Sequence, residues 1–214
     1  LRPASDRQAA MLSLKNLAVA RGGVTVLRGL TLSVAPGQAL ILRGPNGSGK
    51  TTLLRTLAGL QPPAEGCLDL PPDSVAYAAH ADGLKSTLTV TENLSFWSRI
   101  YGGPAIDHAL TALNLTGLTR RRAGELSAGQ KRRLGLARLL VTGRPVWLLD
   151  EPTVSLDVAS VTLFAEVVRG HLAGGGLAVI ATHVDLGLPE AQVLDLDPHR
   201  AREIQSTGFD EAFA

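Results

Sequence analysis

The sequence predicts an α/β fold with a mainly parallel core sheet, a small antiparallel β subdomain and a helical subdomain. Two continuous apolar runs, "PVWLLDEP" and "GLAVIATH", have the length and character of central parallel strands covered on both faces. Between them, "VASVTLFAEVVRGHLAGGG" predicts a crossover helix that is ended by glycines. A further short strand, "GQALILRG", leads into a glycine-rich loop and then a helix ending near Gly59.

Three other regions fall outside this core. The runs "SLKNLAVA" and "VTVLRGLTLSVA" are β-prone and are separated by Arg21-Gly22-Gly23, which predicts a small antiparallel sheet with turns. Residues 61–75 are rich in proline and polar groups and predict a connecting loop. From Thr89 to Gly124 the apolar residues recur at three and four spacing, so this stretch predicts a helical insertion.

Composition narrows the class of protein. The 214 residues fit one domain, and 45% hydrophobic with 19% charged residues is typical of a globular α/β chain. No apolar run approaches the ~18 residues that span a bilayer, so membrane contact is expected only through partners. A formal charge of +2 gives no basis for a nucleic-acid partner. Cys67 is the only cysteine in the sequence, which excludes an internal disulfide framework and a four-cysteine zinc site.

The glycine-rich stretch "GPNGSGKT" fits the phosphate-loop pattern G-x-x-x-x-G-K-[ST] in its required strand–loop–helix context. Glycines let the backbone N–H groups point inward, Lys50 reaches the β- and γ-phosphates, and the Thr51 hydroxyl is offered to Mg²⁺. The predicted nucleotide-binding residues of this motif are Gly44, Pro45, Asn46, Gly47, Ser48, Gly49, Lys50, Thr51 and Thr52.

Acidic and imidazole groups follow the two apolar runs. Asp150 and Glu151 end the first run and His183 follows the second, so all three are expected at the carboxyl edge of the sheet, where ligands bind. Asp150 would hold Mg²⁺, Glu151 would polarise the attacking water, and His183 would hydrogen-bond the γ-phosphate and that water. Glu151, His183 and Lys50 are therefore the predicted catalytic residues.

The stretch "GELSAGQKRRLGLAR" raises the question of a second phosphate site. Ser127 is a good helix N-cap, and Gln130 can complete a capping box. Ala128 and Gly129 are small enough to leave the first amides of the helix open, and such amides attract anions.

The motifs "GPNGSGKTT", "LSAGQKRR", "VWLLDEPTVSLD" and "ATH" together resemble an ABC-type ATPase cassette, a branch of the P-loop NTPases, over residues 12–197. The resemblance implies one domain with a core of residues 12–79 and 126–197, a helical subdomain of residues 80–125, and tails of residues 1–11 and 198–214. It also implies ATP and Mg²⁺ as cofactors.

The same resemblance answers the question of the second site. It implies that Ser127, Ala128, Gly129 and Gln130 form the signature motif, which binds the γ-phosphate of a nucleotide held by a second copy of the chain. Two copies would face each other head to tail with two ATP molecules between them. Asp157 matches the loop that couples the two sites.

Three positions depart from the usual cassette. Arg21 stands where an aromatic residue generally stacks on adenine, and a guanidinium can also stack on a base. His80 takes the place of a glutamine that touches Mg²⁺, which makes His80 a candidate nucleotide and metal contact. Ala128 replaces a signature glycine.

This combination, with "TENLSFWSRIYGG", resembles the ATP-binding subunits of cytochrome c maturation systems, also described as haem exporter subunits. The narrower resemblance implies a peripheral subunit on the cytoplasmic face of a bacterial inner membrane, working with integral membrane permease subunits. The alternatives are the ATPase of another ABC transporter, a soluble ABC ATPase acting on DNA or ribosomes, and a nucleotide kinase.

Two surface features have ordinary interpretations. Phe96, Trp97 and Tyr101 gather in one helical segment, where core packing is the default explanation and a groove for a membrane partner is the alternative. The basic runs Arg120–Arg122 and Lys131–Arg133 predict solvated helix or loop faces.

Overall fold

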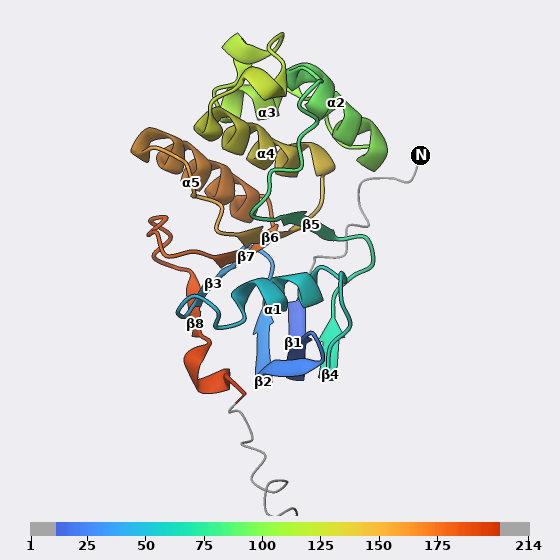
Figure 1. The fold of residues 1–214 in the computed structure, drawn as a ribbon, viewed down its shortest axis with the longest axis vertical. Helices are drawn as coiled ribbons and strands as arrows, with labels where there is room; N and C mark the ends of the chain where they lie inside the picture. Colours follow the sequence, from blue (N-terminus) through green and yellow to red (C-terminus); the bar gives the residue numbers. More distant parts are fainter. Residues whose placement is uncertain (1–11, 202–214) are drawn as a thin grey trace, which may run out of the picture.

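Five parallel strands form the central sheet in the order β5-β6-β7-β3-β8 (Figure 1). The computed structural model describes residues 12–201, so the predicted tail of residues 1–11, and residues 202–214 of the tail predicted for 198–214, lie outside the described residues. The strands are β3 (Ala39–Arg43), β5 (Val75–Ala78), β6 (Val146–Asp150), β7 (Leu177–Ala181) and β8 (Gln192–Asp195). The three strands expected from the apolar runs are confirmed as β3, β6 and β7. Strands β5 and β8 were not predicted; both are four-residue edge strands, and β8 has mostly exposed residues.

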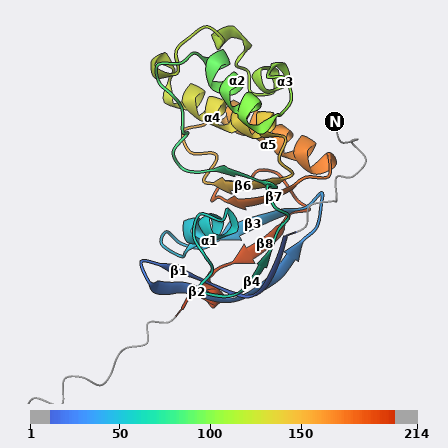
Figure 2. The same ribbon diagram turned by 90° about the vertical axis from the view of Figure 1, so that its right-hand side faces the viewer.

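Both faces of this sheet are covered, which explains the unbroken apolar runs. Successive residues of a strand point to opposite faces, so Leu40 and Leu42 join one core cluster while Ile41 joins the other. Helix α1 (Lys50–Leu57) lies on one face, between the two sheets, and helices α4 (Ala128–Thr142) and α5 (Val158–Ala173) lie on the opposite face (Figures 1 and 2). The crossover helix predicted between the two central strands is therefore confirmed as α5.

The predicted antiparallel sheet is present and has three strands, in the order β2-β1-β4. These are β1 (Leu12–Arg21), β2 (Val24–Val34) and β4 (Glu65–Asp69). The prediction of a connecting loop over residues 61–75 was wrong for β4, which pairs with β1 through Leu14↔Leu68 and Lys15↔Cys67. This pairing is long-range and the strand is mostly exposed, so its five residues carry little apolar pattern of their own.

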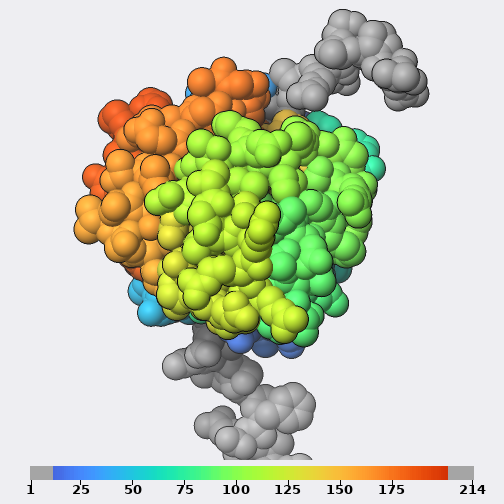
Figure 3. Space-filling model, turned by 90° about the horizontal axis from the view of Figure 1, so that it is seen from above, coloured from blue at the N-terminus to red at the C-terminus, as the bar shows by residue number. Residues whose placement is uncertain are grey.

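The helical insertion is confirmed and covers one end of the molecule (Figure 3). It contains α2 (Val90–Tyr101), α3 (Asp107–Ala112) and the short 3₁₀ turns η1 (Thr116–Leu118) and η2 (Ala123–Glu125). A capping box of Thr89 and Glu92 begins α2, and Gly102 ends it in the left-handed conformation. Over residues 12–201, none of the helices is both long enough and apolar enough to cross a bilayer.

The described chain ends beside the antiparallel sheet. The turn η3 (Asp197–His199) follows β8, and the Ala201 N–H then donates to the Val26 carbonyl at 3.0 Å. Leu196, just before this turn, is fully buried in the cluster that contains α1. These contacts join the end of the parallel sheet to β2.

Candidate functional site

The predicted phosphate loop lies between β3 and α1. Gly44, Gly47 and Gly49 have φ angles of 147°, 82° and 100°, a region that residues with a Cβ rarely adopt. A Cβ added at Gly44 would lie 2.6 Å from the Ser48 hydroxyl oxygen, so the loop has no room for a side chain there. Glycine is therefore required for the tight curl of this loop, a backbone shape that suits anion binding.

Lys50 begins α1 and places its ammonium group at this loop. Its Nζ donates to the Gly44 carbonyl at 2.7 Å and to the Pro45 carbonyl at 3.1 Å. The Ser48 hydroxyl is buried and has no hydrogen-bond partner among residues 12–201. Pro45 and Asn46 are exposed at the tip of the loop, and Thr52 is buried in α1. A held ammonium beside a buried, unpaired hydroxyl suits a phosphate, which would give that hydroxyl a partner.

Thr51 and Asp150 meet at the carboxyl edge of the sheet. The Thr51 hydroxyl donates to Asp150 Oδ2 at 2.8 Å, although the two residues lie on α1 and at the end of β6. The Tyr77 hydroxyl lies 3.5 Å from the same oxygen. Burial raises the pKa of Tyr77 to about 12, and the charge of Asp150 adds to the shift, so Tyr77 stays protonated. A hydroxyl and a buried carboxylate oxygen are suitable ligands for Mg²⁺.

Glu151 and His183 complete the group. Glu151 follows β6 with a φ of 46°, and its Oε1 lies 3.4 Å from His183 Nε2 at the end of β7. The same imidazole nitrogen lies 3.4 Å from Lys50 Nζ. The structure therefore brings the predicted residues of β3, β6 and β7 together at one edge of the sheet, as parallel strands allow.

The signature turn lies elsewhere, at the N-terminus of α4. The capping box is present: the Gln130 N–H donates to the Ser127 hydroxyl at 3.3 Å, and the Ser127 N–H donates to Gln130 Oε1 at 3.0 Å. Ser127 and Ala128 are exposed. A Cβ at Gly129 would lie 3.0 Å from the Ser155 carbonyl, so this turn sits against the segment between β6 and α5.

Asp157 lies in that same segment and caps α5. Its Oδ1 accepts the Ser160 N–H at 2.8 Å. The hydrogen bond with Ser160 lowers the pKa of Asp157, so its carboxyl remains charged over a wider pH range. Its neighbours Val154 and Val158 are exposed, and so is Val184, next to His183.

The other two departures from the usual cassette, His80 and Arg21, are on the surface like Ala128. His80 follows β5 and is exposed, while its carbonyl oxygen accepts a hydrogen bond from Arg132 Nη1 at 3.3 Å. Arg21 is exposed at the end of β1. Neither side chain is buried against other residues of the range 12–201.

Arg132 corrects the expectation of a solvated basic run. It is only 4% exposed, whereas its neighbours Lys131 and Arg133 are partly exposed. Its guanidinium donates to main-chain oxygens of the segments around His80 and Glu151. Sequence reasoning missed this residue because Lys131-Arg132-Arg133 has the composition of a solvated face.

The aromatic cluster of α2 is only partly core. Trp97 is partly buried against the helical core. The Cζ of Arg138 lies over its ring, 4.6 Å from the ring centroid. Phe96 and Tyr101 are 45% and 37% exposed. Core packing therefore explains Trp97, whereas it is wrong for Phe96.

Comparison with known proteins places these motifs in context. Residues 27–154 match the family described as ABC transporter. The chain is 64% identical over 203 residues to the cytochrome c biogenesis ATP-binding export protein CcmA of Rhodobacter capsulatus, covering 95% of each chain. It is 47% identical to the protein of the same name from Paramagnetospirillum magneticum, covering 89% of this chain and 96% of that one.

Solved structures share the fold. An ABC transporter ATP-binding protein from Pyrococcus furiosus superposes with a TM-score of 0.80 at 25% identity, covering 89% of this chain and 100% of that one. The cbiO1 protein of Clostridium perfringens, part of an ABC transporter complex, superposes with a TM-score of 0.69 at 25% identity, covering 81% and 78%.

Proposed function

This chain belongs to the ABC transporter family of ATP-binding proteins, and we propose that it drives a bacterial inner-membrane complex for haem export or haem-chaperone release in cytochrome c maturation. As an ABC ATPase it binds and hydrolyses ATP. The observation that supports the catalytic part most strongly is the meeting of Lys50, Glu151 and His183 at one edge of the sheet.

The phosphate loop accounts for nucleotide binding. Backbone N–H groups of the loop and the buried Ser48 hydroxyl would cradle the phosphates, and Lys50 would exchange its two carbonyl contacts for the β- and γ-phosphates. Thr51 and Asp150 would hold Mg²⁺, with His80 as a further contact in place of the usual glutamine. When bound, Mg²⁺ neutralises the charge that develops on the phosphate oxygens.

Glu151 and His183 are proposed to handle the attacking water. The Glu151 carboxylate orients and polarises the water, and the imidazole of His183 hydrogen-bonds the γ-phosphate and that water. Their separation of 3.4 Å allows both groups to contact one water molecule. The same imidazole nitrogen lies 3.4 Å from Lys50 Nζ. The ammonium group that would contact the phosphates and the imidazole that would contact the water are therefore held at a fixed distance from each other.

ABC ATPases of exporters work as dimers with membrane permease partners. We propose how the two copies of this chain face each other in such a dimer. Ser127, Ala128, Gly129 and Gln130 of one copy would cover the γ-phosphate of the other copy in a head-to-tail dimer. The N-terminus of α4 supports this, because Ser127 and Ala128 are exposed and a helix N-terminus attracts anions. Exposed Val154, Val158 and Val184 beside Asp157 and His183 also suit a covered face.

The haem assignment is supported by relatives that are 62–64% identical over 94–95% of this chain and carry the CcmA name. At this identity, a shared partner set is the simplest expectation. The chain would then be peripheral, on the cytoplasmic face, because ATP must reach it and the permease must span the membrane. Cargo selection would belong to those membrane partners.

Affinity purification tests the proposal. Tagged Glu151→Gln protein is purified with ATP from solubilised native membranes, and copurifying proteins are identified by mass spectrometry. Glu151→Gln should bind ATP without hydrolysing it and so keep the closed complex together. Lys50→Ala is the matched control, since it should not bind ATP and should not trap the complex.

Three outcomes distinguish the candidates. Recovery of haem-handling membrane proteins and a periplasmic haem chaperone supports the proposal. Recovery of a different permease supports the assignment as a transporter ATPase and refutes the haem assignment. Recovery of only soluble partners refutes both and favours a soluble ABC ATPase acting on DNA or ribosomes.

A further inference from the structure

Arg132 forms an unusually dense set of hydrogen bonds for one buried side chain. Its guanidinium donates to five main-chain carbonyls: those of Ala79 at 3.1 Å, His80 at 3.3 Å, Asp150 at 3.3 Å, Glu151 at 2.8 Å and Pro152 at 2.9 Å. Its Nη1 also pairs with Asp82 Oδ1 at 3.0 Å. A buried guanidinium is costly unless it is paired in this way, so these contacts define its position tightly.

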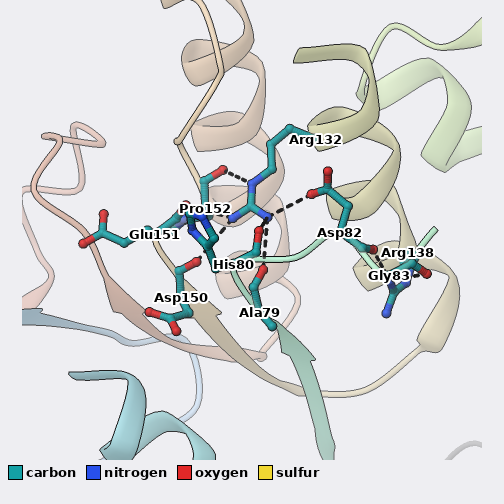
Figure 4. Close-up of polar contacts among 9 residues, drawn as sticks. All are labelled: Ala79, His80, Asp82, Gly83, Arg132, Arg138, Asp150, Glu151 and Pro152. Carbon is teal, nitrogen blue, oxygen red and sulfur yellow. Dashed lines mark hydrogen bonds and ion pairs between the residues drawn. The ribbon is translucent and has the colours of Figure 1, made fainter. Parts of the chain in front are cut away.

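These partners belong to two loops that are far apart in the sequence. One loop, residues 79–82, carries the candidate metal contact His80, and the other, residues 150–152, carries Glu151. Figure 4 shows the guanidinium between the two loops, with the carboxylates of Asp150 and Glu151 directed away from it. Arg132 therefore binds the backbone of both loops and leaves both catalytic-edge carboxylates free to act.

The backbone at Glu151 needs such support. Its φ of 46° is in the left-handed region, which is unfavourable for a residue with a side chain and persists only where neighbours fix it. Three hydrogen bonds fix its peptide groups: its N–H donates to the Ala181 carbonyl at 2.9 Å, and its carbonyl accepts from Arg132 Nη2 at 2.8 Å and from the Val154 N–H at 3.3 Å. Removing Arg132 takes away the shortest of these three hydrogen bonds and leaves the Glu151 carbonyl with only the 3.3 Å contact from Val154.

The same face of α4 also holds the 79–83 loop through other residues. A Cβ at Gly135 would lie 2.9 Å from Asp82 Oδ1, so glycine allows the loop to approach the helix. Arg138 Nη1 donates to the carbonyls of Asp82 and Gly83. The loop is thus seated on α4 along residues 132, 135 and 138, and Arg132 is the one of these that also reaches Glu151.

We propose that Arg132 is a positioning residue for ATP hydrolysis, which holds the Glu151 backbone in its left-handed conformation and ties it to the His80 loop. The inference rests on the proposed function of Glu151. It requires arginine in particular, because the planar fork donates in several fixed directions, whereas a lysine ammonium cannot reach both loops with the same geometry.

Kinetics of three variants test the role. Arg132→Gln removes the charge and most donors, Arg132→Lys keeps the buried charge, and Arg133→Gln is the matched control on the same helix. Arg133 donates only to the carbonyls of Leu113 and Asn114 among the hydrogen bonds of residues 12–201. Each full-length variant is measured for thermal unfolding, for ATP affinity and for kcat and KM in the reconstituted complex.

The positioning role predicts a defect confined to turnover. In Arg132→Gln we expect kcat to fall about 10- to 100-fold, as for a misplaced catalytic group, with ATP affinity within about twofold of the wild type. The kcat of Arg132→Lys should lie between those of Arg132→Gln and the wild type, and Arg133→Gln should retain wild-type kcat. Wild-type kcat in a folded Arg132→Gln protein would overturn the proposal; if that variant does not fold, wild-type kcat in Arg132→Lys would do so.

A double-mutant cycle separates this inference from the proposed function. If Arg132 acts through Glu151, adding Arg132→Gln to Glu151→Gln should lower the residual rate by less than about twofold. A multiplicative loss would mean that Arg132 acts independently of Glu151 and would overturn the proposal. Normal hydrolysis by Glu151→Gln alone would instead refute the catalytic assignment of Glu151.

Discussion

Ser127 has two roles that one substitution can separate. It caps α4, and it is proposed to contact the partner's γ-phosphate. Aspartate is as good an N-cap as serine, and its charge is favourable at a helix N-terminus. Ser127→Asp should therefore preserve the cap while placing a negative charge where the proposed phosphate binds. Ser127→Ala does the opposite, because it removes the cap and adds no charge.

The magnitudes follow from the capping geometry and from electrostatics. The Ser127 hydroxyl accepts one N–H at 3.3 Å, so Ser127→Ala should cost about 1 kcal/mol, which is roughly 2–4 °C in Tm for a chain of this size. Ser127→Asp should melt at or slightly above the wild-type temperature. Two unit charges about 4 Å apart at an effective dielectric near 20 repel by about 4 kcal/mol, so hydrolysis should fall by roughly a thousandfold.

Circular-dichroism melts and ATPase assays of the purified complex measure the two effects. ATP binding by the single subunit serves as the control, since the chain's own phosphate loop is untouched. Wild-type hydrolysis by Ser127→Asp would refute the contact with a partner's phosphate. A melting temperature for Ser127→Asp as low as that of Ser127→Ala would refute the capping argument.

Lys50→Ala should abolish ATP binding, because Lys50 is the one cation at Gly44 and Pro45 in the described structure; tight ATP retention, measured by equilibrium dialysis, would contradict this. Glu151→Gln should bind ATP normally, barely hydrolyse it and accumulate as a dimer in size-exclusion chromatography, and normal turnover would remove Glu151 from the catalytic role. Burial lowers the pKa of His171, so its stabilising contribution is complete above the unfolded value near 6.5 and is lost as the pH falls below it. Urea unfolding between pH 7.5 and 5.5 should show a larger loss of stability for the wild type than for His171→Gln, and equal losses would argue against this assignment.

The parts of the fold that the sequence predicted are those with local signals. The phosphate loop follows from glycines at positions that need positive φ, and the capping box of Ser127 and Gln130 acts within four residues. The central strands were predictable because burial on both faces requires unbroken apolar runs. The order of the motifs then places their side chains at one edge of the sheet.

The parts that were missed depend on partners distant in the sequence. Strand β4 forms because β1 is available to pair with it. Position 66 in this strand accepts only glycine, because a Cβ there would lie 2.2 Å from the Asn16 carbonyl oxygen and clash with it. Arg132 is buried because the loops of residues 79–82 and 150–152 converge on it. A basic run on a helix carries no local sign of such partners, so its composition favours the solvated interpretation.

In the proposed dimer, helix α4 would carry two groups that serve different nucleotides. Its N-terminal turn is proposed to bind the phosphate of the partner's ATP, whereas Arg132, about 7–8 Å along the helix axis from Ser127, supports this chain's own Glu151. A helix moves as a unit, so a shift of its first turn onto a phosphate also moves the guanidinium that holds the Glu151 carbonyl. Since displacements near 1 Å change catalytic rates strongly, closure on one nucleotide would adjust the carboxylate at the other. In this proposal, helix α4 and the Arg132 side chain would couple the two nucleotide sites.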